Sequence, residues 1–299
     1  MFEGLTTALI TPFRDDGSLD RDLWQHLLQK QLVAGTDACI VAGSTGEGAT
    51  LTRDEWTQLL RDAVATAKGA MRIIANASSS STAEACDRAR QAATLGAEGL
   101  LISCPPYNKA PQRGLVAHFD EIARATSLPI MLYNIPGRAA VNLSPETLVQ
   151  IWKNDRIVAI KESSGQLDQA LVMLRDLPAG KVFLSGDDAW TLPLMSLGAK
   201  GVVSVFSNLF PALLKRLVNL VNEEKLSEAR ALHHELMQVM PLLFVESNPI
   251  PVKWALSFLM KKTFSLRLPL VALDSKYHAL LMGPLETLAQ RERETLKKR

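Results

Sequence analysis

Short runs of β-branched and apolar residues recur along this chain, and a stretch with helical periodicity follows each of them. This alternation is typical of βαβ units, in which a helix carries the chain back so that the next strand can run parallel to the last. The runs predict eight strands: Thr6–Thr11, Ala38–Ala42, Arg72–Ala75, Gly99–Ser103, Pro129–Tyr133, Ile157–Lys161, Val182–Ser185 and Gly201–Val205. Eight such units in roughly 220 residues fit a single (β/α)₈ (TIM) barrel, an α/β fold of about 250 residues. A doubly wound sheet is the second possibility.

Helix boundaries between these runs are marked by caps. Thr52-Arg-Asp-Glu55 and Ser81-Thr-Ala-Glu84 fit the capping box, and Ser144 precedes a proline suited to a first helical turn. Gly96 and Gly198 follow helical stretches at positions where glycine closes a helix. These signals support the predicted alternation of strands and helices.

After about Asn222 the strand-like runs stop, and helical periodicity predicts Lys225–Met240, Pro251–Met260 and Ser275–Gln290. No linker rich in Pro, Gly or Ser precedes this part. We therefore expect a barrel with the active site in residues 1–222 and a helical extension, residues 223–299, packed against it. The charged end, residues 290–299, is expected to be a solvated or frayed helix end.

Composition excludes several classes of protein. Hydrophobic residues make up 47% and charged residues 21% of the chain, which is sufficient for a large core. The net charge of +2 gives no indication of a nucleic-acid-binding surface. The first residues show no basic segment followed by an apolar signal core, and no apolar stretch is long enough to span a bilayer. We therefore expect a cytoplasmic protein without nucleic-acid or membrane partners.

Cysteine and histidine spacing gives no metal signal. Cys39, Cys86 and Cys104 are widely spaced, which favours buried unpaired thiols, and the five histidines form no ligand pattern. A metal site is therefore not expected.

Lys161 is the most unusual residue of the predicted barrel, because it closes the apolar run Ile157–Ile160. Burial disfavours a charged amine and makes a free amine available, which is how a lysine forms a Schiff base with a ketone. The alternative is a strand-end lysine whose stem packs on apolar surface while its head reaches water or pairs with Glu162.

Polar residues gather at the carboxyl ends of five predicted strands, where barrels of this kind carry their chemistry. These ends are Gly43-Ser-Thr-Gly-Glu-Gly48, Cys104-Pro-Pro-Tyr-Asn108, Tyr133-Asn-Ile-Pro-Gly-Arg138, Lys161-Glu-Ser-Ser-Gly165 and Ser185-Gly-Asp-Asp188. The glycine loop could bind a carboxylate through Ser44 and Thr45, or be only a tight turn. Tyr133 could shuttle protons or be a half-buried aromatic, and Arg138 could grip a carboxylate or be solvated.

Taken together, these motifs resemble the dihydrodipicolinate synthase family over nearly the whole chain. The matching segments are Gly43-Ser-Thr-Gly-Glu47, Pro106-Tyr-Asn108, Tyr133-Asn-Ile-Pro-Gly-Arg138, Ile160-Lys-Glu162, Ser185-Gly-Asp-Asp188 and Asn248-Pro-Ile-Pro-Val-Lys253. The family lies in the superfamily of pyruvate-dependent class I aldolases and lyases. The resemblance implies a lyase that condenses pyruvate with L-aspartate 4-semialdehyde for diaminopimelate and lysine biosynthesis.

The resemblance also assigns roles. Lys161 would form the imine, Tyr133 would move protons, and Ser44 and Tyr107 would complete a hydroxyl relay. The binding residues would be Thr45 and the Val203 carbonyl for pyruvate, Arg138 for the carboxylate of the second substrate, and Gly186 and Asp187 for its aldehyde end. Tyr107 is expected to come from a neighbouring subunit of a homotetramer (a dimer of dimers) or a homodimer. No cofactor is implied, because the protonated imine is the electron sink.

Two positions depart from the family pattern. Ser44 replaces the usual threonine but keeps the hydroxyl, and Pro106 stands where many synthases carry an interface tyrosine of the L-lysine inhibition site. Around Glu84 the matching positions of that site are Gly48, Arg53, Trp56, Ser80 and Pro106. We therefore expect an enzyme that is insensitive to millimolar lysine.

Two alternatives remain open at this point. One is a sister aldolase that cleaves N-acetylneuraminate or a keto-sugar acid, for which Arg138 is a poor fit. The other is a non-catalytic barrel that binds a keto acid, since fold alone does not imply function.

Overall fold

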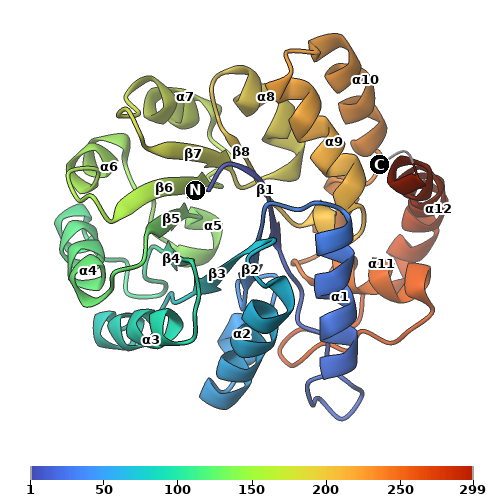
Figure 1. Ribbon diagram of the computed structural model, residues 1–299, viewed down its shortest axis with the longest axis horizontal. Coiled ribbons are helices and arrows are strands. Elements are labelled where there is room, and N and C mark those ends of the chain that lie inside the picture. Colours follow the sequence, from blue (N-terminus) through green and yellow to red (C-terminus); the bar gives the residue numbers. More distant parts are fainter. Residues whose placement is uncertain (1, 298–299) are drawn as a thin grey trace.

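The computed structural model describes residues 2–297 and confirms the predicted barrel (Figure 1). All eight strands pair in parallel and in chain order, and β8 closes onto β1. Their bounds are β1 Gly4–Ala8, β2 Ala38–Val41, β3 Arg72–Asn76, β4 Gly99–Ser103, β5 Ile130–Asn134, β6 Ile157–Glu162, β7 Val182–Ser185 and β8 Gly201–Ser204. The doubly wound alternative is wrong, because that sheet would have two open edges.

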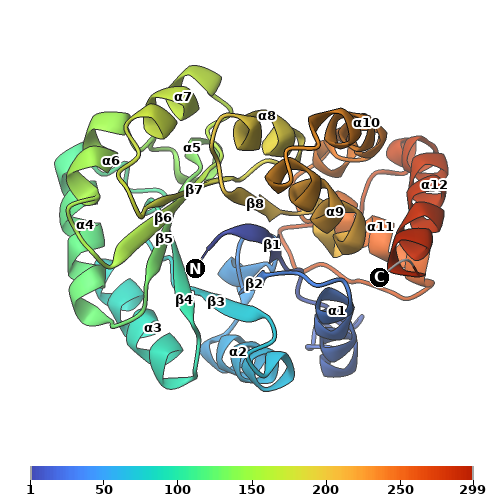
Figure 2. The same ribbon diagram turned by 45° about the horizontal axis from the view of Figure 1, so that its top comes forward.

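A ring of helices surrounds the strands, as Figures 1 and 2 show. The helices of the barrel are α1 Arg21–Val33, α2 Arg53–Ala67, α3 Thr82–Thr94, α4 Gln112–Ala125, α5 Pro136–Ala139, α6 Pro145–Ile151, α7 Leu167–Arg175, α8 Thr191–Ser196 and α9 Pro211–Asn222. Short 3₁₀ turns η1 Gly48–Thr50, η2 Asp188–Trp190 and η3 Phe206–Asn208 follow β2, β7 and β8. Thr52 forms the predicted capping box, and Ser81 and Ser144 accept hydrogen bonds from the first turns of α3 and α6.

Two apolar layers build the core. One fills the barrel interior and includes Ile40, Met131, Ala159 and Val203. The other packs between the outer faces of the strands and the helices. Side chains alternate along a strand, so every second residue of each strand points into the barrel interior. The site lies on this inner side.

The first strand begins two residues earlier and ends three residues earlier than the sequence predicts. It covers Gly4–Ala8 and not Thr6–Thr11, because Gly4 pairs with Gly201 of β8 while the chain turns away after Ala8. There the Ile10 amide donates to Asn208 Oδ1, 3.0 Å away, in place of a strand partner.

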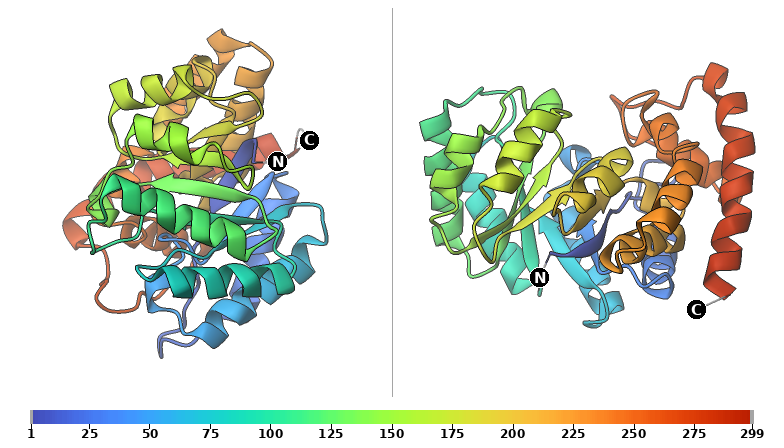
Figure 3. Two further views of the ribbon diagram at one scale, coloured as in Figure 1. Left: turned by 90° about the vertical axis from the view of Figure 1, so that its left-hand side faces the viewer. Right: turned by 90° about the horizontal axis from the view of Figure 1, so that it is seen from above.

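Three further helices follow the barrel: α10 Leu226–Leu236, α11 Ile250–Met260 and α12 His278–Lys297. Helix α10 ends at Leu236, four residues before the predicted end, and turn η4 Pro241–Phe244 follows it. Turn η5 Ser275–Tyr277 replaces the start of the third predicted helix. Figure 3 shows α12 at the outer edge, beside α9 and α11. None of the helices within residues 2–297 is both long and apolar enough to cross a membrane.

The expectation of a frayed C-terminal end is wrong for the described part, because α12 remains helical up to Lys297. Lys298 and Arg299 lie outside the described residues, but Glu292 is buried and accepts from the amides of Ala212 and Leu213, 2.8 and 2.9 Å away. Because the first amides of a helix have no partner within the helix, this carboxylate caps the N-terminus of α9 from α12. It also faces Lys30, whose pKa is lowered to about 8 by burial.

We expect Glu292→Ala to destabilise the protein by about 1–2 kcal/mol, because two buried amides lose their acceptor. Urea denaturation followed by circular dichroism measures this loss as a shift of the midpoint. Glu286→Ala, at an exposed position of the same helix, is the control and should change stability by less than about 0.5 kcal/mol. Equal effects of the two substitutions would contradict the capping role.

Candidate active site

Lys161 lies on β6 with its side chain inside the barrel. It follows Ala159 of the interior layer by two residues, so its side chain points the same way, and it is 5% exposed. Such low exposure favours the buried amine over the alternative of a strand-end lysine whose head lies in solvent. Glu162 points to the other face, where its carboxylate accepts from Asn134 Nδ2 and from the Ser164 amide.

Tyr133 covers the lysine. The two residues are register neighbours on β5 and β6, and Lys161 Nζ lies 3.9 Å from the centroid of the Tyr133 ring. Tyr133 is 7% exposed. The ladder hydrogen bonds of two central strands thus hold an amine against an aromatic face within a nearly closed interior.

Gly186 and Asp187 lie beside the same amine. A Cβ at Gly186 would lie 1.8 Å from Ser163 Oγ, 2.9 Å from the Glu162 carbonyl oxygen and 3.0 Å from Lys161 Cε, so a side chain there would displace its neighbours, the lysine among them. Burial raises the pKa of Asp187, while the charge of Lys161 acts in the opposite direction. An acid and an amine therefore face each other at the ends of β6 and β7.

The end of β8 is fixed by Asp188, which the sequence analysis did not assign. Val203 is fully buried in the barrel interior and pairs with Thr6 of β1. Just beyond it, Asp188 Oδ2 accepts from the amides of Val205 and Phe206 at 3.0 and 2.9 Å. Burial raises the pKa of Asp188 to about 6.

The glycine loop after β2 carries Ser44 and Thr45. A Cβ at Gly48 would lie 2.0 Å from the Ala42 carbonyl oxygen, and Glu47 adopts a left-handed conformation with φ of 51°. Thr45 is buried, whereas Ser44 lies on the wall of a cavity. The loop thus has the backbone of a tight turn, and this turn places Ser44 on the cavity wall.

That cavity has a volume of about 510 Å³ and opens at the carboxyl ends of the strands. Its walls come from the loops after β2, β3, β4 and β5 and from the segment around η4 and α11. Arg138 of α5 contributes to the wall, and its Nη2 donates to the backbone carbonyl of Asn248, 2.7 Å away.

Tyr107 is exposed in the single chain, as are Ser44 and Arg138 on the cavity wall. It follows β4 with φ of 74°, and 90% of its surface is exposed. The other predicted residues lie at the mouth or in the interior of the barrel.

A buried ion pair that the sequence analysis missed holds the glycine loop in place. Lys253 of α11 pairs with Glu47, and both side chains are almost fully buried. The amide of Arg267 donates to Glu47 Oε2, 3.0 Å away, and the Arg267 guanidinium binds Glu55. A lysine within the apolar stretch Ile250–Leu256 was the available signal for such a contact.

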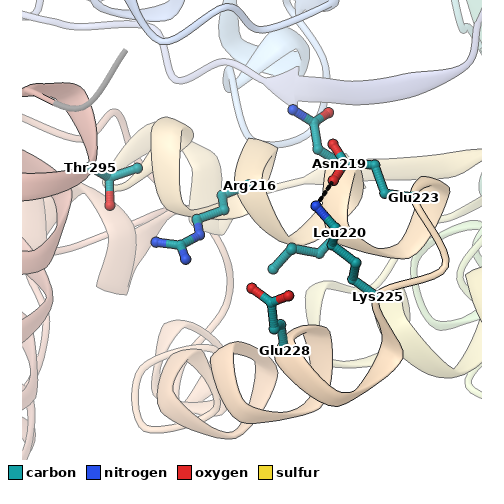
Figure 4. Close-up of a pocket in the computed structure, with 7 residues that line it drawn as sticks. All are labelled: Arg216, Asn219, Leu220, Glu223, Lys225, Glu228 and Thr295. Carbon is teal, nitrogen blue, oxygen red and sulfur yellow. Dashed lines mark ion pairs between the residues drawn. The ribbon is translucent and has the colours of Figure 1, made fainter.

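A second cavity, of about 380 Å³, lies in the outer helix layer among α9, α10 and α12 (Figure 4). Arg216 and Glu228 face each other across it, and Glu223 pairs with Lys225 at its edge. The seven residues that line it include none of the predicted site residues. The barrel mouth is therefore the better candidate for the active site.

The fold and the site together define a class: a (β/α)₈ barrel with a buried, tyrosine-covered lysine near the carboxyl ends of its strands. The chain belongs to the dihydrodipicolinate synthetase family, whose model matches residues 1–288.

Full-length relatives agree with this assignment. The 4-hydroxy-tetrahydrodipicolinate synthase of Exiguobacterium sp. is 41% identical over 286 residues, which cover 96% of this chain and 98% of that protein. The structure of the same enzyme from Methylacidiphilum fumariolicum SolV has a TM-score of 0.92 at 41% identity and covers 100% and 98% of the two chains. The chloride-inhibited dihydrodipicolinate synthase from Acinetobacter baumannii, solved with pyruvate, has a TM-score of 0.93 at 34% identity and covers 98% and 99%.

Removing one partner of the buried pair should be costly, because the other charge stays buried and unpaired. We expect Lys253→Met to lower the free energy of unfolding by about 3–5 kcal/mol, and the added substitution Glu47→Gln to restore part of it by removing that charge. Urea denaturation of the two single variants and the double variant gives the coupling energy. Lys262→Met, at an exposed position, is the control. Simple addition of the two single losses would show that the pair is not coupled.

Proposed function

We propose that the protein is a lyase that condenses pyruvate with L-aspartate 4-semialdehyde to give 4-hydroxy-tetrahydrodipicolinate. The observation that carries this proposal is the buried Lys161, whose Nζ lies 3.9 Å from the centroid of the Tyr133 ring, in a chain 41% identical over nearly its full length to a synthase of that name. A buried amine beside a phenol has the two groups that imine formation needs, a nucleophile and a proton carrier.

The chemistry begins at Lys161. Its free amine attacks the ketone carbon of pyruvate, and loss of water gives the imine. The imine nitrogen then withdraws electrons, so that a methyl proton leaves and an enamine forms. The enamine carbon attacks the aldehyde carbon of the second substrate. Attack of the substrate amine on the imine carbon finally closes the ring and releases Lys161.

Proton transfer falls to hydroxyl groups. Tyr133 lies against the amine and would carry protons to and from the reacting centre, with Ser44 and Tyr107 as the next links. The 90% exposure of Tyr107 supports our inference that this ring enters the site of a neighbouring copy, in a homotetramer or homodimer. The three free cysteines agree with the reducing cytoplasm as the location.

Binding groups complete the proposal. Thr45 and the Val203 carbonyl would hold pyruvate, and Arg138 at the cavity wall would bind the carboxylate of the second substrate. Gly186 and Asp187 would lie at its aldehyde end, which fits their place beside Lys161. The barrel interior would exclude water from the enamine.

Borohydride reduction in the presence of pyruvate tests the imine. We expect one pyruvate adduct per chain, found by mass spectrometry at Lys161, and loss of activity with aspartate semialdehyde. Lys161→Ala should abolish the adduct, whereas Tyr133→Phe should still form it but lower turnover by about 10²–10⁴-fold, the range for a general acid–base group.

A panel of aldehydes and keto-sugar acids in the same assay separates the synthase from a sister aldolase. Labelling that survives Lys161→Ala would disprove the Schiff base, and binding without turnover would favour a keto-acid-binding barrel.

Insensitivity to L-lysine has a physical basis around Glu84. Both oxygens of this carboxylate are occupied, since Ser79 Oγ donates to one at 2.6 Å and Arg88 Nη2 to the other at 2.6 Å. The Ser79 hydrogen bond and the nearby charges of Arg88 and Arg53 lower the pKa of Glu84. A cationic effector would therefore meet a carboxylate that is already neutralised.

We expect steady-state rates with both substrates to stay constant across a titration to millimolar L-lysine. Each missing hydrogen bond weakens binding by roughly 0.5–3 kcal/mol, so two or three losses reduce affinity by orders of magnitude. Half-inhibition at sub-millimolar lysine would show that the effector pocket works despite these substitutions.

A further inference from the structure

Asn248 touches both residues assigned to substrate carboxylates. It lies between η4 and α11, on the wall of the barrel-mouth cavity, and is 6% exposed. Its side-chain Nδ2 donates to Thr45 Oγ1 at 2.9 Å, and its backbone carbonyl accepts from Arg138 Nη2 at 2.7 Å. One residue from the C-terminal part of the chain thus spans the distance between the pyruvate site and the second-substrate site.

The oxygen of the same amide is unpaired. Asn248 Oδ1 is buried and has no hydrogen-bond partner within residues 2–297. A buried acceptor without a donor is unfavourable, and buried polar groups in native proteins are nearly always paired. Because Nδ2 is tied to Thr45 and the backbone to Arg138, the direction of Oδ1 is fixed relative to the guanidinium.

Of the described residues in this cavity wall, no other amide or carboxylate side chain lacks both a hydrogen bond and an ion pair. Within the described residues that line it, Glu47 and Asn76 are the remaining two. Glu47 is neutralised by Lys253 and accepts from the Arg267 amide, and Asn76 Oδ1 accepts from the Ser78 hydroxyl at 2.7 Å. Among the amide and carboxylate groups of the described wall residues, Asn248 Oδ1 is thus the acceptor that has neither a hydrogen bond nor an ion pair.

The neighbouring guanidinium indicates which donor this is. In an α-amino acid the carboxylate and the ammonium group sit on one carbon, so a carboxylate on Arg138 places the ammonium group within a few ångströms of it. We propose that Asn248 Oδ1 accepts a hydrogen bond from the α-ammonium group of the second substrate and makes the site specific for an amino aldehyde. This assignment rests on the proposed condensation.

A neutral acceptor suits the reaction better than a carboxylate would. The substrate nitrogen must lose its proton before it can attack the imine carbon and close the ring. An amide oxygen orients the ammonium group, whereas a facing carboxylate would stabilise the charged form and raise its pKa. Asparagine thus provides recognition without trapping the nucleophile.

The test compares L-aspartate 4-semialdehyde with 4-oxobutanoate, which has the same chain and aldehyde but no amino group. The measured quantity is the ratio of kcat/KM for the two aldehydes at constant pyruvate, or of inhibition constants where one is not turned over. We expect Asn248→Leu to reduce this ratio by about 10–100-fold, the loss of one charge-assisted hydrogen bond. A disturbance of Thr45 acts on pyruvate and hence on both aldehydes, so it cancels in the ratio.

Two matched variants make the result decisive. Asn248→Asp should lower KM and kcat for the amino aldehyde together, because the carboxylate binds the ammonium group and retains its proton, and it should leave 4-oxobutanoate without that gain. Arg138→Ala should weaken both aldehydes while keeping their ratio, because both carry the carboxylate. A ratio unchanged in Asn248→Leu, or equal effects of Asn248→Asp on both aldehydes, would overturn the assignment. Failure of the unaltered protein to condense pyruvate with either aldehyde would instead overturn the proposed function, and the assignment with it.

Discussion

The buried pair between Glu47 and Lys253 is the contact on which the barrel mouth depends. Desolvation disfavours both charges and lowers the pKa of Lys253 to about 8, so the pair persists only because each side chain has further partners. Lys253 also donates to the Ser265 carbonyl and lies 4.4 Å from the centre of the Phe13 ring, and Arg267 stacks on the same ring at 4.1 Å. The left-handed turn at Glu47, and with it the position of Thr45, is thus held by chain from outside the eightfold repeat.

The barrel and its central lysine could be predicted because their signals are local. Strand parity follows from alternation within a few residues, so the sequence alone places Lys161 and Tyr133 at the ends of neighbouring strands. Strand β1 was misplaced because Leu9, Ile10 and Thr11 are as apolar and β-branched as the strand itself. The strand ends where Asn208, just after the neighbouring strand β8, takes the Ala8 carbonyl and the Ile10 amide as partners.

The contacts that the sequence did not reveal join residues about 200 positions apart. Asn248 meets Thr45, and Lys253 meets Glu47, in each case across most of the chain. No periodicity or local spacing carries such a pairing. The charged C-terminal stretch was expected to be solvated for the same reason, since the residues next to Glu292 in the sequence are charged. Glu292 is buried because two amides of α9 have no other acceptor.

The candidate site therefore has two parts, one held by strands of the barrel and the other by contacts between loops. Lys161 and Tyr133 lie on adjacent strands, where ladder hydrogen bonds fix them, so the imine chemistry that we propose would depend on the geometry of the sheet. Arg138 lies on the four-residue helix α5, and Asn248 lies in the connection before α11. These two side chains are held by contacts between loops and can change without disturbing a strand. If the proposed roles hold, the choice of second substrate can vary while the reaction of the lysine stays the same, because separate parts of the structure carry the two properties.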